Sequence, residues 1–255
     1  MKPIQVKVGE VAIKTCCVVY DKDGTLVDFH SVWGPRMVHS ANALLAATDL
    51  GDDFVHHLYR AVGYDPKTNR TLGQGPLATA PLDQLVIVVA TAMFQSGITW
   101  DKALEFANTY LLPLMAAQPT AKEIAPRGDV LSSLQALQQH GCRLGVATTD
   151  NRESTHLMLR HLGIQDCLSQ VICGNDPGPV KPDPKVLVSI ARTQKIPVSQ
   201  LIMVGDTVSD MVMSRRAGAG LSVGITGGAG THDELAAHAD VLIDDISEIR
   251  PASTS

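Results

Sequence analysis

Apolar residues follow two different patterns along this chain of 255 residues. From about residue 128 onward, short apolar runs alternate with segments in which apolar residues recur at helical spacing. The runs are expected to be strands, and they lie at 143–147, 170–173, 201–204, 221–225 and 241–243. Nearly continuous apolar strands that are separated by helices are typical of a parallel sheet covered on both faces. We therefore predict an α/β core in this part of the chain.

Helices are expected between these strands, and local signals mark some of their ends. One helix through Val130 and Leu137 is followed by Gly141, which is a common residue after a helix end. Two more are expected around residues 157–162 and 186–190. Thr231 and Glu234 have the spacing of a capping box, which predicts a short helix that begins there.

The N-terminal segment also predicts strands. Ile4, Val6 and Val8 alternate with polar residues, which indicates an edge strand or a hairpin. The apolar run that ends at Tyr20 is expected to be the first strand of the core sheet. Residues 1–29 are therefore predicted to belong to the same core domain as residues 121–255.

Residues 30–120 show a different pattern, in which apolar residues recur at helical spacing and no strand pattern interrupts them. We expect about four helices, with a loop at residues 73–76, where glycine and proline cluster. This helical insert begins immediately after the first core strand. It is therefore predicted to be a second domain that lies over the end of that strand.

Composition excludes several classes of function. The net charge of −5 and the absence of a Lys/Arg cluster argue against a surface that binds nucleic acid. The longest apolar runs are too short to cross a membrane, and the N-terminus lacks the apolar region of a secretory signal. The five cysteines show no C-x-x-C spacing and lie mostly in apolar runs, as buried reduced thiols do. These features favour a cytoplasmic protein.

Two aspartates end the first core strand, at Asp21 and Asp23, and Gly24 follows them. Residues spaced i, i+2 in a strand point to the same face. Two carboxylates at the end of a buried strand are costly unless they bind a cation or perform acid–base chemistry. The alternative is an ordinary Asp-Gly turn in which both carboxylates are solvated.

Further polar residues follow other predicted strands. Thr148 and Thr149 come after the strand at 143–147, and Asp206 and Asp210 come after the strand at 201–204. Lys181 lies between them in a proline-rich loop. Ligands of open parallel sheets bind at the carboxyl ends of the strands, so these residues are candidates for one site. Each also has a simpler interpretation: Thr148 as a helix cap, Lys181 as a surface lysine, and the aspartates as a cap and a solvated acid.

This set of motifs resembles the haloacid dehalogenase superfamily of phosphotransferases. The resemblance is carried by D-x-D-G-T at 21–25, the threonine at 148, K-P-x-P at 181–184 and G-D-x-x-x-D at 205–210. It implies a Rossmann-like core, and the helical insert resembles the type-1 cap of phosphoglycolate phosphatase-like members. A Mg²⁺ ion is then expected at the strand ends.

The roles of the residues follow from this resemblance and from their chemistry. Asp21 is expected to attack phosphorus and form an aspartyl-phosphate, while Asp23 serves as general acid and base. The expected Mg²⁺ ligands are Asp21, the backbone carbonyl of Asp23, and Asp206. Asp210 either binds the metal through water or orients Lys181. Phosphate oxygens are expected to be bound by Thr148, Thr149 and Lys181.

The residue at position 23 narrows the reaction. By the same family resemblance, haloacid dehalogenases need no acid at this position and phosphonate hydrolases have an alanine there. An aspartate at position 23 therefore argues against both activities. We therefore predict a Mg²⁺-dependent phosphomonoester hydrolase that acts on a small phosphorylated metabolite, and the resemblance favours a phosphatase of the phosphoglycolate type. A hexose-phosphate mutase and a catalytically silent binding module on the same fold remain alternatives.

The helical insert contributes further candidates. Arg36, Arg60 and Arg70 are possible anchors for an anionic substrate, and His30 and Trp33 are close enough to the first motif to line the entrance. The insert is expected to act as a lid with hinges near residues 29–31 and 121–127.

Overall fold

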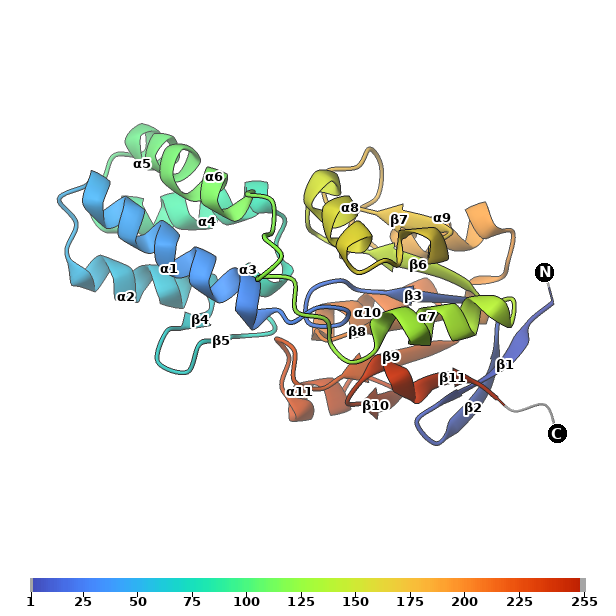
Figure 1. The fold of residues 1–255 in the computed structure, drawn as a ribbon. Coiled ribbons are helices and arrows are strands. Elements are labelled where there is room, and N and C mark those ends of the chain that lie inside the picture. The colour runs from blue at the N-terminus through green and yellow to red at the C-terminus, as the bar shows by residue number, and fades with distance from the viewer. Residues whose placement is uncertain (1, 253–255) are drawn as a thin grey trace.

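The centre of the protein is a parallel sheet of six strands in the order β10-β9-β8-β3-β6-β7 (Figure 1). The structure is a computed structural model that describes residues 2–252. The strands of this sheet are β3 (Cys17–Tyr20), β6 (Arg143–Ala147), β7 (Gln170–Ile172), β8 (Leu201–Gly205), β9 (Leu221–Ile225) and β10 (Val241–Ile243). The predicted α/β class and all six predicted core strands are confirmed.

Strand β3 lies in the middle of the sheet, and its end sets the position of the site. Tyr20 pairs with Val146 of β6 on one side and with Val204 of β8 on the other. The carboxyl ends of these three strands therefore lie next to one another. The segments that follow Tyr20, Ala147 and Gly205 leave the sheet at the same edge.

The side chains of β3 alternate between two hydrophobic clusters, one on each face of the sheet. Val18 and Tyr20 pack in the cluster that contains the apolar residues of α7 (Val130–Gln139) and Leu159 of α8 (Arg152–His161). Cys17 and Val19 pack on the other face with α9 (Lys185–Gln194) and α10 (Val208–Ala217). All four residues of β3 are fully buried.

Short elements complete the core. The predicted capping box at Thr231 begins α11 (His232–Ala236), and Thr231 accepts the hydrogen bond from the Glu234 backbone. The 3₁₀ helices are η2 (Gln165–Cys167), η3 (Val198–Gln200) and η4 (Ile246–Glu248). Among residues 2–252, no helix combines the length and the apolar character that a membrane span requires.

The N-terminal residues form a hairpin of β1 (Ile4–Val8) and β2 (Val11–Thr15), as the alternation indicated. The hairpin is not an edge of the central sheet. It forms a separate antiparallel sheet with β11 (Ile249–Pro251), which the sequence did not predict. Val6 and Val8 of β1 are fully buried on the face of this sheet that packs against the central core.

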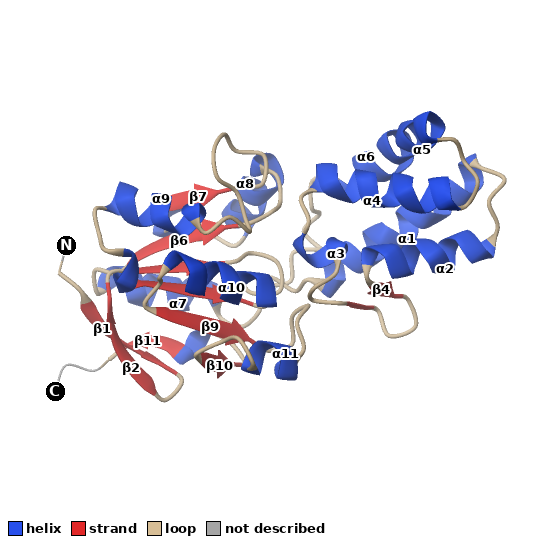
Figure 2. Cartoon of the chain, turned by 180° about the vertical axis from the view of Figure 1, so that it is seen from behind, coloured by secondary structure: helices blue, strands red, loops and turns tan. Residues whose placement is uncertain are grey.

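The helical insert lies beyond the carboxyl ends of the strands (Figure 2). Its helices are α1 (His30–Ala47), α2 (Asp52–Val62), α3 (Pro76–Thr79), α4 (Leu82–Gln95), α5 (Trp100–Phe106) and α6 (Leu112–Met115), with a π-helical turn, η1 (Ala107–Leu111), between the last two. They pack around a hydrophobic cluster that is separate from those of the sheet.

One expectation for the insert was wrong. The structure has a small antiparallel hairpin, β4 (Tyr64–Asp65) and β5 (Arg70–Thr71), where no strand was predicted. Each strand has only two residues, which is too short for a period of two to be visible. The predicted loop at 73–76 lies between β5 and α3.

The two connections between insert and core run side by side. The backbone N–H of Asp28 donates to the Ala125 carbonyl at 2.8 Å, and that of Arg127 donates to the Leu26 carbonyl at 3.0 Å. These contacts lie beside the predicted hinges. We propose that residues 30–120 form a cap domain and that the remaining residues form the core.

Candidate active site

Asp21 and Asp206 meet where strands β3 and β8 end. The Asp21 backbone N–H donates to the Val204 carbonyl at 2.8 Å and so continues the pairing of the two strands. Gly24 has a φ of +82°, and a side chain on it would collide with the Asp206 carboxylate. Only glycine therefore allows the chain to turn away at this point without displacing Asp206.

Lys181 joins two of the carboxylates. Its Nζ lies 2.5 Å from Oδ1 of Asp21 and 2.6 Å from Oδ1 of Asp210. Asp210 is fully buried, and its other oxygen accepts a 2.7 Å hydrogen bond from the Thr207 hydroxyl within the capping box of α10. Asp210 is therefore not a solvated acid, and Lys181 is not an ordinary surface lysine.

The carboxylates of Asp21, Asp206 and Asp210 fit a metal ion. Each offers an oxygen that lies within 4.8 Å of the others, and all three residues are buried. Oδ1 of Asp206 is buried without a hydrogen-bond partner, which is costly for a carboxylate unless a ligand occupies the site. Hard oxygen donors of this kind suit Mg²⁺.

The protonation of these groups shows the same need for a cation. Burial raises the pKa of Asp21 to about 7, although Lys181 acts in the opposite direction. Burial also raises the pKa of Asp206 well above its ordinary value, and the charges of Asp21 and Asp210 add to this effect. The charged forms are therefore unfavourable together until a positive ion is added.

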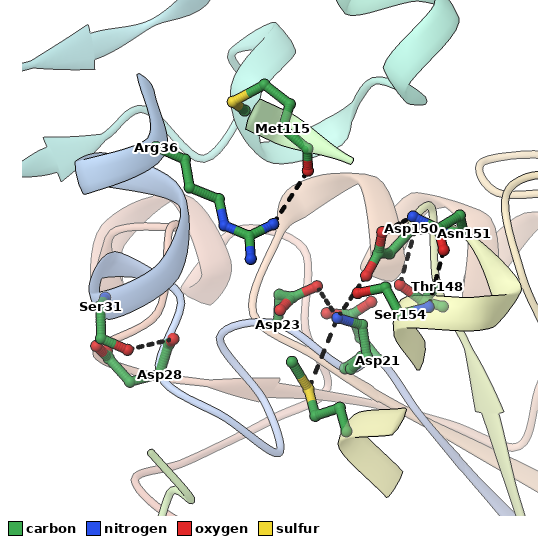
Figure 3. A network of polar contacts seen from close by, with 12 residues as sticks. Asp21, Asp23, Asp28, Ser31, Arg36, Met115, Thr148, Asp150, Asn151 and Ser154 are labelled. Atoms are coloured by element: carbon green, nitrogen blue, oxygen red, sulfur yellow. Dashed lines mark hydrogen bonds and ion pairs between the residues drawn. The ribbon is translucent and has the colours of Figure 1, made fainter. Parts of the chain in front are cut away.

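The Asp23 carboxylate belongs to a second cluster, which Figure 3 shows. The ammonium group of Lys22 lies 2.7 Å from Asp23 Oδ2 and 3.0 Å from Asp150 Oδ2. Lys22 is fully buried and also contacts the sulfur of Met158 at 3.7 Å. Burial lowers the pKa of Lys22, but the charges of Asp150 and Asp23 outweigh this effect and raise it.

Neither Lys22 nor Asp150 was assigned a role in the site from the sequence, although Asp150 directly follows the two threonines after β6. The available signal was a lysine just after one buried strand and an acid just after the next core strand, which together indicate a possible ion pair. Because β3 and β6 are neighbours in register, residues just beyond their ends are brought together. The separation of 128 positions hid this pairing from local pattern analysis.

Thr148 and Thr149 differ in their surroundings. Thr148 is buried, and its Oγ1 accepts a 3.1 Å hydrogen bond from the Asp150 backbone (Figure 3). The residue that caps α8 is Asn151, so the alternative in which Thr148 caps that helix is wrong. Thr149 lines the pocket over the carboxylates, together with Asp150 and Lys181.

The insert covers this pocket. Its contribution to the lining is largely apolar and comes from α1, α3, α4 and the turns beside them: Trp33, Leu77, Ala78, Thr79, Ala80, Leu82 and Leu85. Phe29, the core residue directly before α1, lines the pocket beside them. Of the five insert candidates, Trp33 lines the pocket, whereas His30, Arg36, Arg60 and Arg70 do not.

Comparisons with known proteins agree with this geometry. The model of the family described as haloacid dehalogenase-like hydrolase matches residues 17–218. The chain belongs to this family of hydrolases. It is an enzyme on the same grounds, so the family assignment argues against the silent binding module.

Named relatives of this haloacid dehalogenase-like hydrolase include a phosphoglycolate phosphatase of Agrobacterium fabrum. The two are 27% identical over 234 residues, which cover 92% of this chain and 90% of the relative. A phosphoglycolate phosphatase of Rhodospirillum rubrum is 29% identical over 79% of this chain and 76% of its own length. The crystal structure of a predicted phosphoglycolate phosphatase from Haemophilus somnus has the same fold. The TM-score is 0.66 at 19% identity, with 92% of this chain and 96% of that chain covered.

Arg127 is a further residue of this hydrolase that the sequence did not indicate. Its guanidinium donates to the Gly24 carbonyl, directly after the aspartates, and to the Thr226 carbonyl at 2.5 Å, beyond the end of β9. Arg127 therefore ties the loop after Asp21 and Asp23 to the core. We interpret it as a residue that holds this loop in place.

Proposed function

We propose that this protein is a Mg²⁺-dependent phosphomonoester hydrolase that acts on a small phosphorylated metabolite through an aspartyl-phosphate intermediate. The observation that supports this most strongly is the position of Lys181, which bridges Asp21 and Asp210 beside Asp206. A cation beside a potential nucleophile provides a place for a phosphate dianion. Buried carboxylates on the other side provide the place for Mg²⁺.

Asp21 is the proposed nucleophile. One of its oxygens attacks phosphorus, the bond between phosphorus and the ester oxygen breaks, and the enzyme is left as an aspartyl-phosphate. Lys181 holds the phosphoryl oxygens near Asp21, and Thr148 and Thr149 are proposed to donate hydrogen bonds to them. When bound, Mg²⁺ neutralises the carboxylates and the phosphate.

Asp23 is the proposed general acid and base. Its Oδ2 is held by Lys22, while its Oδ1 is buried and has no hydrogen-bond partner. That oxygen is free to give a proton to the departing alcohol oxygen. It then takes a proton from the water that attacks the aspartyl-phosphate, and inorganic phosphate is released.

The ligands proposed for Mg²⁺ are Asp21, Asp206 and the backbone carbonyl of Asp23. Asp210 already bonds Lys181 and Thr207, so we propose that it mainly orients Lys181. The cap is proposed to close over the site and exclude bulk water during turnover. A phosphopeptide is too large to be enclosed in this way, so we expect compact metabolites to be preferred.

The test is phosphate release from a panel of phosphorylated metabolites with Mg²⁺, beginning with phosphoglycolate because the relatives are named for it. Asp21→Asn is expected to remove nearly all activity. Reduction of acid-quenched enzyme with borohydride should convert an aspartyl-phosphate at position 21 to homoserine, which mass spectrometry detects. A hexose-phosphate mutase would instead interconvert sugar phosphates and release little phosphate. If no homoserine is found at position 21, the aspartyl-phosphate intermediate is contradicted.

A further inference from the structure

The pocket over the catalytic aspartates has two chemically different halves. The core half carries the charged and hydroxyl groups of Asp21, Asp23, Thr149, Asp150, Lys181, Thr207, Ser209 and Asp210. The cap half consists of apolar side chains and one threonine. Because the phosphate occupies the core half, the cap half surrounds the rest of the substrate. Its chemistry therefore defines which alcohol is released.

The cap half contains no charged side chain. Phe29 and Trp33 form one wall, with ring centroids 6.4 Å apart and the planes tilted by 35°. Leu77 and Leu85 are almost fully buried in the same lining. The hydroxyl of Thr79 already donates to the Gly75 carbonyl at 3.0 Å.

The cap arginine nearest in sequence to Trp33 is engaged elsewhere. Arg36 is buried, bonds Glu123 at 2.9 Å and donates to the carbonyls of Met115 at 3.1 Å and Ala117 at 2.7 Å (Figure 3 shows the bond to Met115). Among residues 2–252, Lys181 is the one cation in the lining, and it faces Asp21 and Asp210. The lining therefore offers a second anionic group on the substrate no side-chain cation besides Lys181.

Trp33, which lines the pocket, carries a buried polar group without a hydrogen-bond partner. Its side chain is over nine-tenths buried, and its Nε1 has no hydrogen-bond partner. A buried indole N–H usually finds an acceptor, because leaving it unpaired costs free energy. A hydroxyl or carbonyl oxygen of a ligand satisfies this requirement once the ligand displaces the atoms that shield Nε1 from solvent.

We propose that the substrate is the phosphate monoester of an uncharged alcohol, whose apolar part packs on Phe29 and Trp33 and whose oxygen accepts a hydrogen bond from Trp33 Nε1. A phosphocarboxylate fits this pocket poorly. Its carboxylate would be desolvated against leucine and aromatic side chains, and four aspartates lie in the same lining. This inference rests on the proposed phosphomonoesterase function and narrows its substrate class.

The test compares two esters of nearly equal size that differ in charge: 2-phosphoglycolate and 2-hydroxyethyl phosphate. We expect kcat/KM to be at least tenfold higher for the hydroxyethyl ester, and higher still for uncharged esters with a larger apolar part. A higher kcat/KM for phosphoglycolate would overturn the inference. If no ester is hydrolysed, including p-nitrophenyl phosphate, the proposed function itself fails.

Variants of the cap half test the two parts of the argument separately. Trp33→Phe keeps an aromatic side chain but removes the N–H together with part of the indole. It is expected to lower kcat/KM for hydroxyethyl phosphate about three- to tenfold, as the loss of one hydrogen bond predicts. Ethyl phosphate, which lacks the acceptor, should be much less affected. Equal losses for both esters would show that Trp33 only packs.

Ala80→Lys places a cation in the lining, and Ala80→Met is its control of similar length without charge. The lysine variant is expected to shift the ratio of kcat/KM values toward phosphoglycolate by at least tenfold relative to the methionine variant. The same ratio in both variants would contradict the claim that a missing cation excludes the carboxylate.

Discussion

Replacement of Lys22 by methionine tests the buried cluster that joins the ends of β3 and β6. The substitution keeps an unbranched side chain next to the Met158 sulfur but removes the ammonium group from Asp23 and Asp150. The carboxylates of Asp23 and Asp150 then lose the positive charge that they share, and Asp150 is buried. Removal of one partner from a buried ion pair typically costs about 3–5 kcal/mol.

The measurement is urea unfolding of Lys22→Met and of the unchanged protein under the same conditions. With a slope of about 3 kcal/mol per molar urea, the loss corresponds to a midpoint lowered by about 1–1.7 M. Lys7→Met is the matched control. Lys7 pairs with Glu10 at the same distance of 3.0 Å, but that pair is solvated, and such pairs contribute about 0–1 kcal/mol.

The double variant Lys22→Met/Asp150→Asn shows whether the destabilisation arises from the missing pairing. It leaves one unpaired carboxylate where Lys22→Met leaves two, so it should recover part of the lost stability. Groups in direct contact are expected to be coupled in this way. The reasoning is refuted if Lys22→Met unfolds at the midpoint of Lys7→Met, or if the losses of the two single variants simply add.

Three further predictions concern the proposed general acid, the proposed metal site and the thiols. Asp23→Asn should slow hydrolysis of alkyl phosphates about 10²–10⁴-fold, and p-nitrophenyl phosphate much less, because a good leaving group needs little protonation; equal losses would contradict the acid role. Mg²⁺ should raise the melting temperature of the unchanged protein but not that of Asp206→Asn, because it relieves the repulsion between buried carboxylates, and equal shifts in both proteins would contradict the metal site. Burial raises the pKa of Cys17 and Cys142 to about 12 and that of Cys173 to about 11. The folded protein therefore binds more protons than the unfolded chain above pH 9. The urea concentration at the unfolding midpoint should therefore decrease as the pH is raised from about 9 to about 12, and a midpoint that stays constant over this range would refute the prediction.

The sequence by itself determined the elements whose information is local. The apolar runs and helical spacings of the core predicted all six central strands, since periodicity reports which face of an element is buried. The four motifs also predicted which residues gather at the strand ends, and the structure brings Asp21, Lys181, Asp206 and Asp210 together. Parallel strands place their carboxyl ends at one edge, so their order along the chain was sufficient for this inference.

Tertiary structure decided the contacts that join distant segments. The pairing of β1 with β11 connects the two ends of the chain, and neither short strand has enough residues to reveal its partner. Lys22 acquires its position through Asp150, and the cap half of the pocket is assembled from separate turns and helices. An arginine on a helix is usually exposed to solvent, but Arg36 is buried and pairs with Glu123. Such pairings depend on how segments that are distant in sequence pack together. Burial then makes each charge interact more strongly with its partner and makes an unpaired charge more costly.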